Sequence, residues 1–174
     1  MDYTVSVEVP GVTDPNVLYQ YQLGLFHSLW SSIDVTADYL IGHFLKLPHN
    51  DALMITWGMM FGPKAKLLAT LIRLSDHQKK RELMTALNVI RNDGKRDVIT
   101  HGYQLENEEG VAFLERSRGS QDFETRLHAF TREEFKMHVN KLIGASNDFY
   151  EASGATVAEI QEFVDAARRL AKKA

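Results

Sequence analysis

Apolar residues recur at helical spacing over most of the chain, so the sequence predicts a mainly helical protein. The first and longest helix is expected from Pro15 to Leu47, because Asp14 is a good N-cap and proline is favoured at the first helical position. Proline or glycine breaks separate it from the later segments. The further predicted helices are Ala52–Phe61, Lys64–Leu74, His77–Arg91, Lys95–His101, Arg132–Glu151 and one that follows Thr156 and reaches Leu170.

The spacing changes to strict alternation in the region after residue 110. Val111–Arg116 and Glu124–Phe130 alternate, and a polar, glycine-containing turn joins them, which predicts a β-hairpin. The expected fold class is therefore all-α, a helical bundle with a long first helix and a small β-hairpin insertion near 111–130.

Length and composition favour one soluble domain. The 174 residues suit a single domain over 1–174. Residues 1–13 are expected to be an N-terminal arm with a strand at Tyr3–Val9; the arm is acidic and alternating, unlike a signal peptide. Glycine and proline interrupt the longest apolar stretch, so no membrane contact is expected and the predicted location is the cytoplasm.

The net charge and the residue types present limit which ligands and metal sites are expected. The net charge of −3 has the wrong sign for gripping nucleic acid by bulk charge, so any contact with RNA would be local. The chain has no cysteine, and its seven histidines form no HxxxH or HExxH pair, so neither a metal nor a cofactor is expected. Asp34 and Asp38 lie four residues apart, but no second paired motif accompanies them as a di-metal bundle site requires.

The segment KRDVITHGYQ, residues 95–104, combines an arginine, an acid and a histidine at a predicted helix end. Asp97 and His101 are four residues apart and would stack on one helix face, where the carboxylate would orient the imidazole. Gly102 is expected to end the helix in a left-handed conformation. Arg96 lies about 140° around the helix from His101, and its guanidinium is suited to clamp a phosphate. An arginine beside a general acid/base suffices for metal-free RNA cleavage.

A spacing of five to seven residues from arginine to histidine carries no information alone, because Arg132 and His138, six residues apart inside an ordinary helix, also satisfy it. The first pair differs in its setting. A polar residue follows Arg96, a helix end follows His101, and glycine and tyrosine come next.

Arg96 to Tyr103 resembles the motif of the HEPN superfamily, in the R-x4-H-x-Y form of HEPN toxins paired with minimal nucleotidyltransferases. The resemblance implies a metal-independent endoribonuclease with a composite site between two copies of a homodimer. Arg96 and His101 would be catalytic, Asp97 would assist, and Tyr103 would support the site or be modified by a nucleotidyltransferase-type antitoxin. The family more commonly has asparagine at the position of Asp97, which adds a negative charge where the phosphate would dock.

Two alternatives remain open at this point. One is a non-catalytic HEPN-like module that binds RNA, a nucleotide or a protein partner. The other is a purely structural helical dimer, in which Arg96, Asp97 and His101 form a salt-bridge network and Tyr103 belongs to the core.

Overall fold

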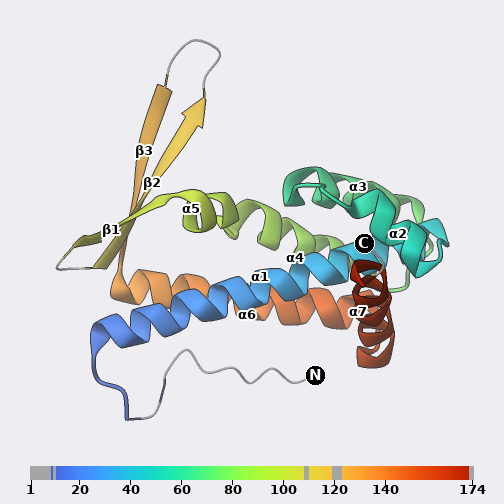
Figure 1. The fold of residues 1–174 in the computed structure, drawn as a ribbon, viewed down its shortest axis with the longest axis horizontal. Helices are drawn as coiled ribbons and strands as arrows, with labels where there is room; N and C mark the ends of the chain where they lie inside the picture. The colour runs from blue at the N-terminus through green and yellow to red at the C-terminus, as the bar shows by residue number, and fades with distance from the viewer. Residues whose placement is uncertain (1–8, 10, 108–109, 119–122, 173–174) are drawn as a thin grey trace.

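The structure, a computed structural model, describes residue 9 and residues 11–107, 110–118 and 123–172. It confirms a mainly helical bundle with a small antiparallel sheet (Figure 1). The elements are α1 (Pro15–Leu45), α2 (His49–Thr56), α3 (Phe61–Leu74), α4 (Lys80–Asp93), α5 (Arg96–His101), β1 (Tyr103–Asn107), β2 (Gly110–Arg118), β3 (Phe123–Thr131), α6 (Arg132–Ser153) and α7 (Val157–Ala171).

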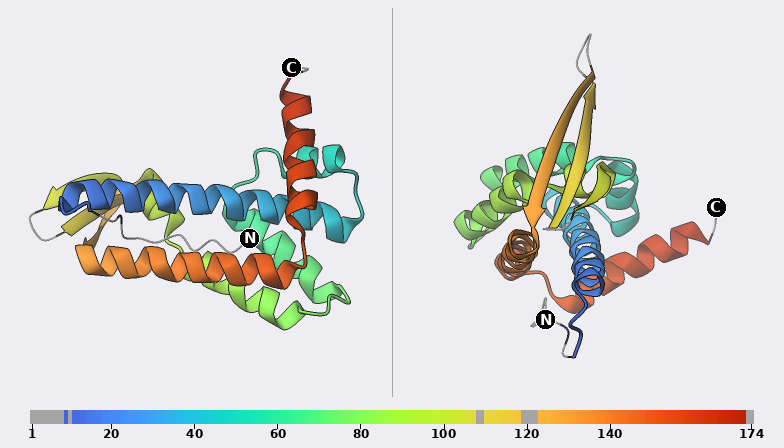
Figure 2. Two further views of the ribbon diagram at one scale, coloured as in Figure 1. Left: turned by 90° about the horizontal axis from the view of Figure 1, so that it is seen from below. Right: turned by 90° about the vertical axis from the view of Figure 1, so that its left-hand side faces the viewer.

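The long helix α1 is the centre of the bundle. It packs against α6 along its length and against α2 and α3 at its C-terminal half, while α4 packs against α6 and α3. α7 follows the end of α6, crosses α1 and also packs against α2 (Figure 2). The core is built from large side chains that these helices and the base of the sheet bury almost completely: Phe26, Ile33, Leu40, Leu68, Ile72, Leu83, Leu87, Ile90, Phe113, Phe135 and Phe149.

Local signals fix the ends of the long helices. The Asp14 carboxylate accepts a hydrogen bond from the Asn16 amide at 2.9 Å and caps α1. α6 begins with a capping box in which Thr131 and Glu134 bond each other's backbone amides, and α7 begins in the same way at Thr156. These starts follow the sequence prediction.

The sheet has three strands, whereas the sequence predicted two. β2 and β3 form the expected hairpin, which extends away from the helices (Figure 1), and β1 pairs with the other edge of β2. β1 was missed because its sequence, YQLEN, is short and polar, and backbone pairing with β2 rather than an apolar face defines it.

Several predicted boundaries are wrong. α2 ends at Thr56 rather than Phe61, and α3 begins at Phe61, so Gly62 and Pro63 lie in its first turn, where proline removes no required hydrogen bond. Gly102 is extended, with φ −70°, rather than left-handed. Of the predicted strand Tyr3–Val9, all but the last residue lies outside the described residues.

In the described part of the chain, no helix is long and apolar enough to cross a bilayer.

The close approach of α1 and α2 gives a stability test. A Cβ added at Gly42 would overlap the Cβ of Ala52, so we expect Gly42→Ala to lower the free energy of unfolding by about 1–3 kcal/mol. Gly24→Ala is the matched control on the same helix, because nothing lies within 4 Å of its added Cβ. There the higher helix propensity of alanine should stabilise the protein by about 0.5–1 kcal/mol. Urea unfolding measures both, and equal effects would contradict the packing described.

Candidate functional site

The predicted site residues lie on α5 and the strand that follows it. Lys95, with a left-handed φ of 46°, turns the chain between α4 and α5. The Ile99 amide bonds the Lys95 carbonyl at 3.0 Å, and the Gly102 amide bonds the Val98 carbonyl at 2.9 Å. Val98 and Ile99 are buried, so this short helix is anchored to the core by one face and presents the other to solvent.

Arg96 rests on an aromatic side chain of α1. Its guanidinium carbon lies 5.8 Å from the centroid of the Trp30 ring, and 28% of the Arg96 side chain remains exposed. Trp30 is buried and meets the ring of Phe61 edge to face at 4.9 Å. A guanidinium over an indole gains about 0.5–2 kcal/mol, so Trp30 restricts where the Arg96 head group can lie.

The turn before α5 is held against the same tryptophan. A Cβ at Gly94 would lie 2.6 Å from Cζ2 of Trp30, so only glycine fits between α4 and α5 without displacing the ring. The half-buried His138 of α6 lies next to Gly94, whose backbone raises the pKa of the imidazole and so opposes the larger lowering by burial. Its ring packs near Phe26 and Phe130, with centroids 6.1 and 5.8 Å away.

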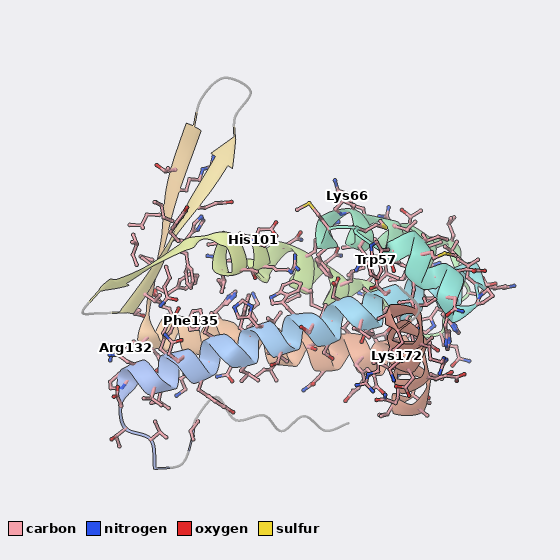
Figure 3. The ribbon with its side chains drawn as sticks, in the orientation of Figure 1. Trp57, Lys66, His101, Arg132, Phe135 and Lys172 are labelled. Carbon is pink, nitrogen blue, oxygen red and sulfur yellow. The ribbon has the colours of Figure 1, made fainter. Side chains whose placement is uncertain are left out.

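The second arginine–histidine pair is therefore placed quite differently from the first. His138 is half-buried under the turn that starts α5, whereas Arg132 is exposed at the start of α6 (Figure 3). His138 supports the position of α5 and does not share a surface site with Arg132.

Asp97 and His101 are both exposed on α5. The Asp97 side chain is 72% exposed, and its Oδ1 lies 3.9 Å from the Arg96 guanidinium, a long ion pair. Within the described residues, no hydrogen bond or ion pair joins Asp97 to His101. The structure thus brings Asp97 to Arg96 and leaves the imidazole of His101 open to solvent (Figure 3).

Tyr103 lies on the outer face of the sheet, not in the core. It stands opposite Leu114 of β2, which stands opposite Leu127 of β3, so the three side chains form a row across one face. Tyr103 is 55% exposed and Leu127 61%. The opposite face carries Phe113 and Phe130, which are buried against the helices.

The chemistry that this arrangement permits is acid–base and electrostatic. Arg96 and His101 lie five residues apart on one helix, about 7.5 Å along its axis and about 140° around it, so the long arginine side chain has to provide most of the reach to a shared phosphate. Among the described residues, no group of three histidine or acidic side chains could hold a metal ion.

Sequence reasoning missed two supporting residues, Trp30 and His138. Trp30 fits the apolar stripe of α1, so nothing in the local pattern separates it from ordinary core residues. His138 was noted only as the second half of an arginine–histidine spacing. Both act across contacts far apart in sequence, which no local pattern could reveal.

Comparison with known proteins adds no relative: no family model, curated protein or solved structure matches the chain.

Because the His138 imidazole is partly buried, the stability of the protein is expected to depend on pH. Burial lowers the pKa of His138; the Gly94 backbone and Asp93 oppose this shift, and nearby Lys95 and Lys141 add to it. The unfolded state therefore binds more protons than the native state between the lowered pKa and the ordinary value of 6.5, and stability falls as pH drops through this range. Unfolding by urea at several pH values should show this loss in wild type. His138→Gln, which does not titrate, should show a flatter dependence, and parallel curves would contradict the assignment.

Proposed function

We propose that the protein is a metal-independent endoribonuclease of HEPN type that acts as a homodimer in the cytoplasm. The observation that supports this most is the joint placement of Arg96 and His101. Both belong to one short anchored helix, both are reachable from solvent, and the arginine is oriented by Trp30. A positioned cation and a solvent-accessible imidazole are the groups that metal-free phosphodiester cleavage needs.

The reaction would begin at the ribose. His101 removes the proton of the 2′-hydroxyl, and that oxygen attacks the adjacent phosphorus. Arg96 stabilises the charge on the non-bridging phosphate oxygens. As the bond from phosphorus to the 5′-oxygen breaks, an imidazolium returns a proton to the leaving oxygen. The products are a 2′,3′-cyclic phosphate and a 5′-hydroxyl, and this step consumes no water.

A second copy would complete the site. The row of Tyr103, Leu114 and Leu127 begins two residues after His101, and partly exposed apolar rows of this kind suit protein contacts. Pairing of two copies near this surface would bring both α5 helices to one RNA strand.

In this proposal, modification of Tyr103 would regulate the nuclease activity. Its side chain is 55% exposed, two residues after His101, so a nucleotidyltransferase-type antitoxin could reach it. A nucleotide attached there would add negative charge and bulk beside the proposed catalytic groups and would oppose the binding of an RNA phosphate.

The same apolar row also favours a second function, that of a non-catalytic HEPN-like module that binds a protein partner. In that case the outer sheet face would be the functional surface, and Arg96 and His101 would have no part in chemistry. RNA cleavage separates the two functions.

The nuclease proposal predicts cleavage of single-stranded RNA in EDTA. His101→Ala and Arg96→Ala should each slow it by about 10²-fold or more, because each removes a group that acts in the transition state. His43→Ala and Arg132→Ala are matched controls: both residues are exposed, and His43 lies about 20 Å along α1 from Trp30. Cleavage rates that are the same in His101→Ala and His43→Ala would reject a catalytic role for His101.

Removal of the Asp97 charge is predicted to increase the rate of RNA cleavage. An exposed carboxylate 3.9 Å from the Arg96 guanidinium weakens the attraction of that cation for phosphate. Asp97→Asn should therefore increase kcat/KM for RNA by about two- to fivefold at low salt, and less at high salt. Asp148→Asn removes an exposed charge on α6 and should have no effect. A lower kcat/KM for Asp97→Asn would instead show that the carboxylate assists the reaction.

A further inference from the structure

A second candidate site lies beside the C-terminal half of α1, beyond Trp30. A cavity of about 360 Å³ opens between α1, α2, α3 and α7. Its apolar walls include Leu53, Trp57, Met59 and Phe163. Cavities of about 300–1,000 Å³ with apolar walls and a few converging polar groups are typical of small-molecule sites.

Three charged side chains meet at this cavity. The Lys64 ammonium, only 3% exposed, lies 2.8 Å from Asp34 Oδ1 and 2.7 Å from Asp38 Oδ1. The Asp38 side chain is 17% exposed and that of Asp34 35%. Since the other described residues that line the cavity are uncharged, one positive and two negative charges leave a net charge of −1.

A net negative charge on partly buried groups is unfavourable unless a proton or a cation balances it. Burial raises the pKa of Asp38; the adjacent Lys64 opposes this shift, and the Asp34 charge adds to it. A bound cation would therefore stabilise the ionised form of Asp38 more than that of Asp34. Asp34 is the more exposed of the two, so an incoming ligand reaches it first.

Trp57 gives a second reason to expect a ligand. It caps the C-terminus of α2 beside the cavity and is 84% exposed, which is unusual for the largest apolar side chain. Figure 3 shows it at the α2 end of the molecule, well away from His101. An exposed indole at the rim of a negatively charged cavity can cover alkyl groups and attract a cation to its face.

We propose that this cavity binds a small organic cation, an aliphatic amine or guanidine. Its charged group would bond the carboxylates of Asp34 and Asp38, and its methylene groups would lie against Leu53, Phe163 and Trp57. A metal ion fits this site less well, because the Lys64 ammonium already lies between the two carboxylates. In addition, no group of three metal-binding side chains occurs in the described part of the chain. The proposal does not depend on the nuclease activity.

Calorimetric titration of the full chain with putrescine and with agmatine tests the proposal. 1,4-Butanediol serves as a neutral probe of similar length, and MgCl2 controls for ionic strength. Saturable binding of at least one of the two cations, with no binding of the diol or Mg²⁺, is the expected result. Equal heats from the diol, saturable binding of Mg²⁺, or no saturable binding of either amine at millimolar concentration would overturn the proposal.

Variants then locate the binding site. Trp57→Ala changes an exposed side chain and Asp34→Asn a partly exposed one, so both should fold, which circular dichroism checks. Each should weaken binding of the cation at least about tenfold, as the loss of a charged contact or an aromatic face typically does. Asp51→Asn removes an exposed charge on α2 outside the cavity and should bind as wild type does. Unchanged affinity in both Trp57→Ala and Asp34→Asn would place the ligand elsewhere and reject the site.

Discussion

The candidate RNA site depends on the contacts that the buried ring of Trp30 makes. The ring lies in the middle of α1, where Phe61 covers one side and the Arg96 guanidinium another. It also leaves no room for a side chain at Gly94, so the turn that directs α5 follows the outline of the indole. The position of the arginine is thus set by the core of the bundle and not by the short helix that carries it.

The contact between α1 and α3 joins both proposed sites. Near the middle of α1 it is aromatic, through Trp30 and Phe61. One turn farther along α1 it becomes ionic, through Asp34 and Lys64 at 2.8 Å. The same pair of helices therefore contributes to both proposed sites. At one it supports Arg96, which would bind an anion, and at the other it carries the carboxylates that would bind a cation. Each site is supported by a buried side chain on a helix, Trp30 in one case and Lys64 in the other.

The parts of the fold that could be predicted from sequence are those set by local rules. The helical period and the Asp14 and Thr131 caps placed α1 and α6, because capping and amphipathicity act within a few residues. β1 could not be predicted, since its pairing with β2 is what makes it a strand. At the candidate site, the sequence located the short helix that carries Arg96 and His101. It could not show Trp30 beneath Arg96, because 66 residues separate the two in the chain.

The central claim is that a guanidinium held on Trp30 acts with His101 on RNA, and the RNA-cleavage rate of Arg96→Lys in EDTA tests it most directly. Lysine keeps the charge but lacks the planar group that lies on the indole and bonds two phosphate oxygens. The account predicts that wild type cleaves RNA and that Arg96→Lys is slower by at least about tenfold with little change in melting temperature. No cleavage by wild type, or equal rates for the two proteins, would contradict it.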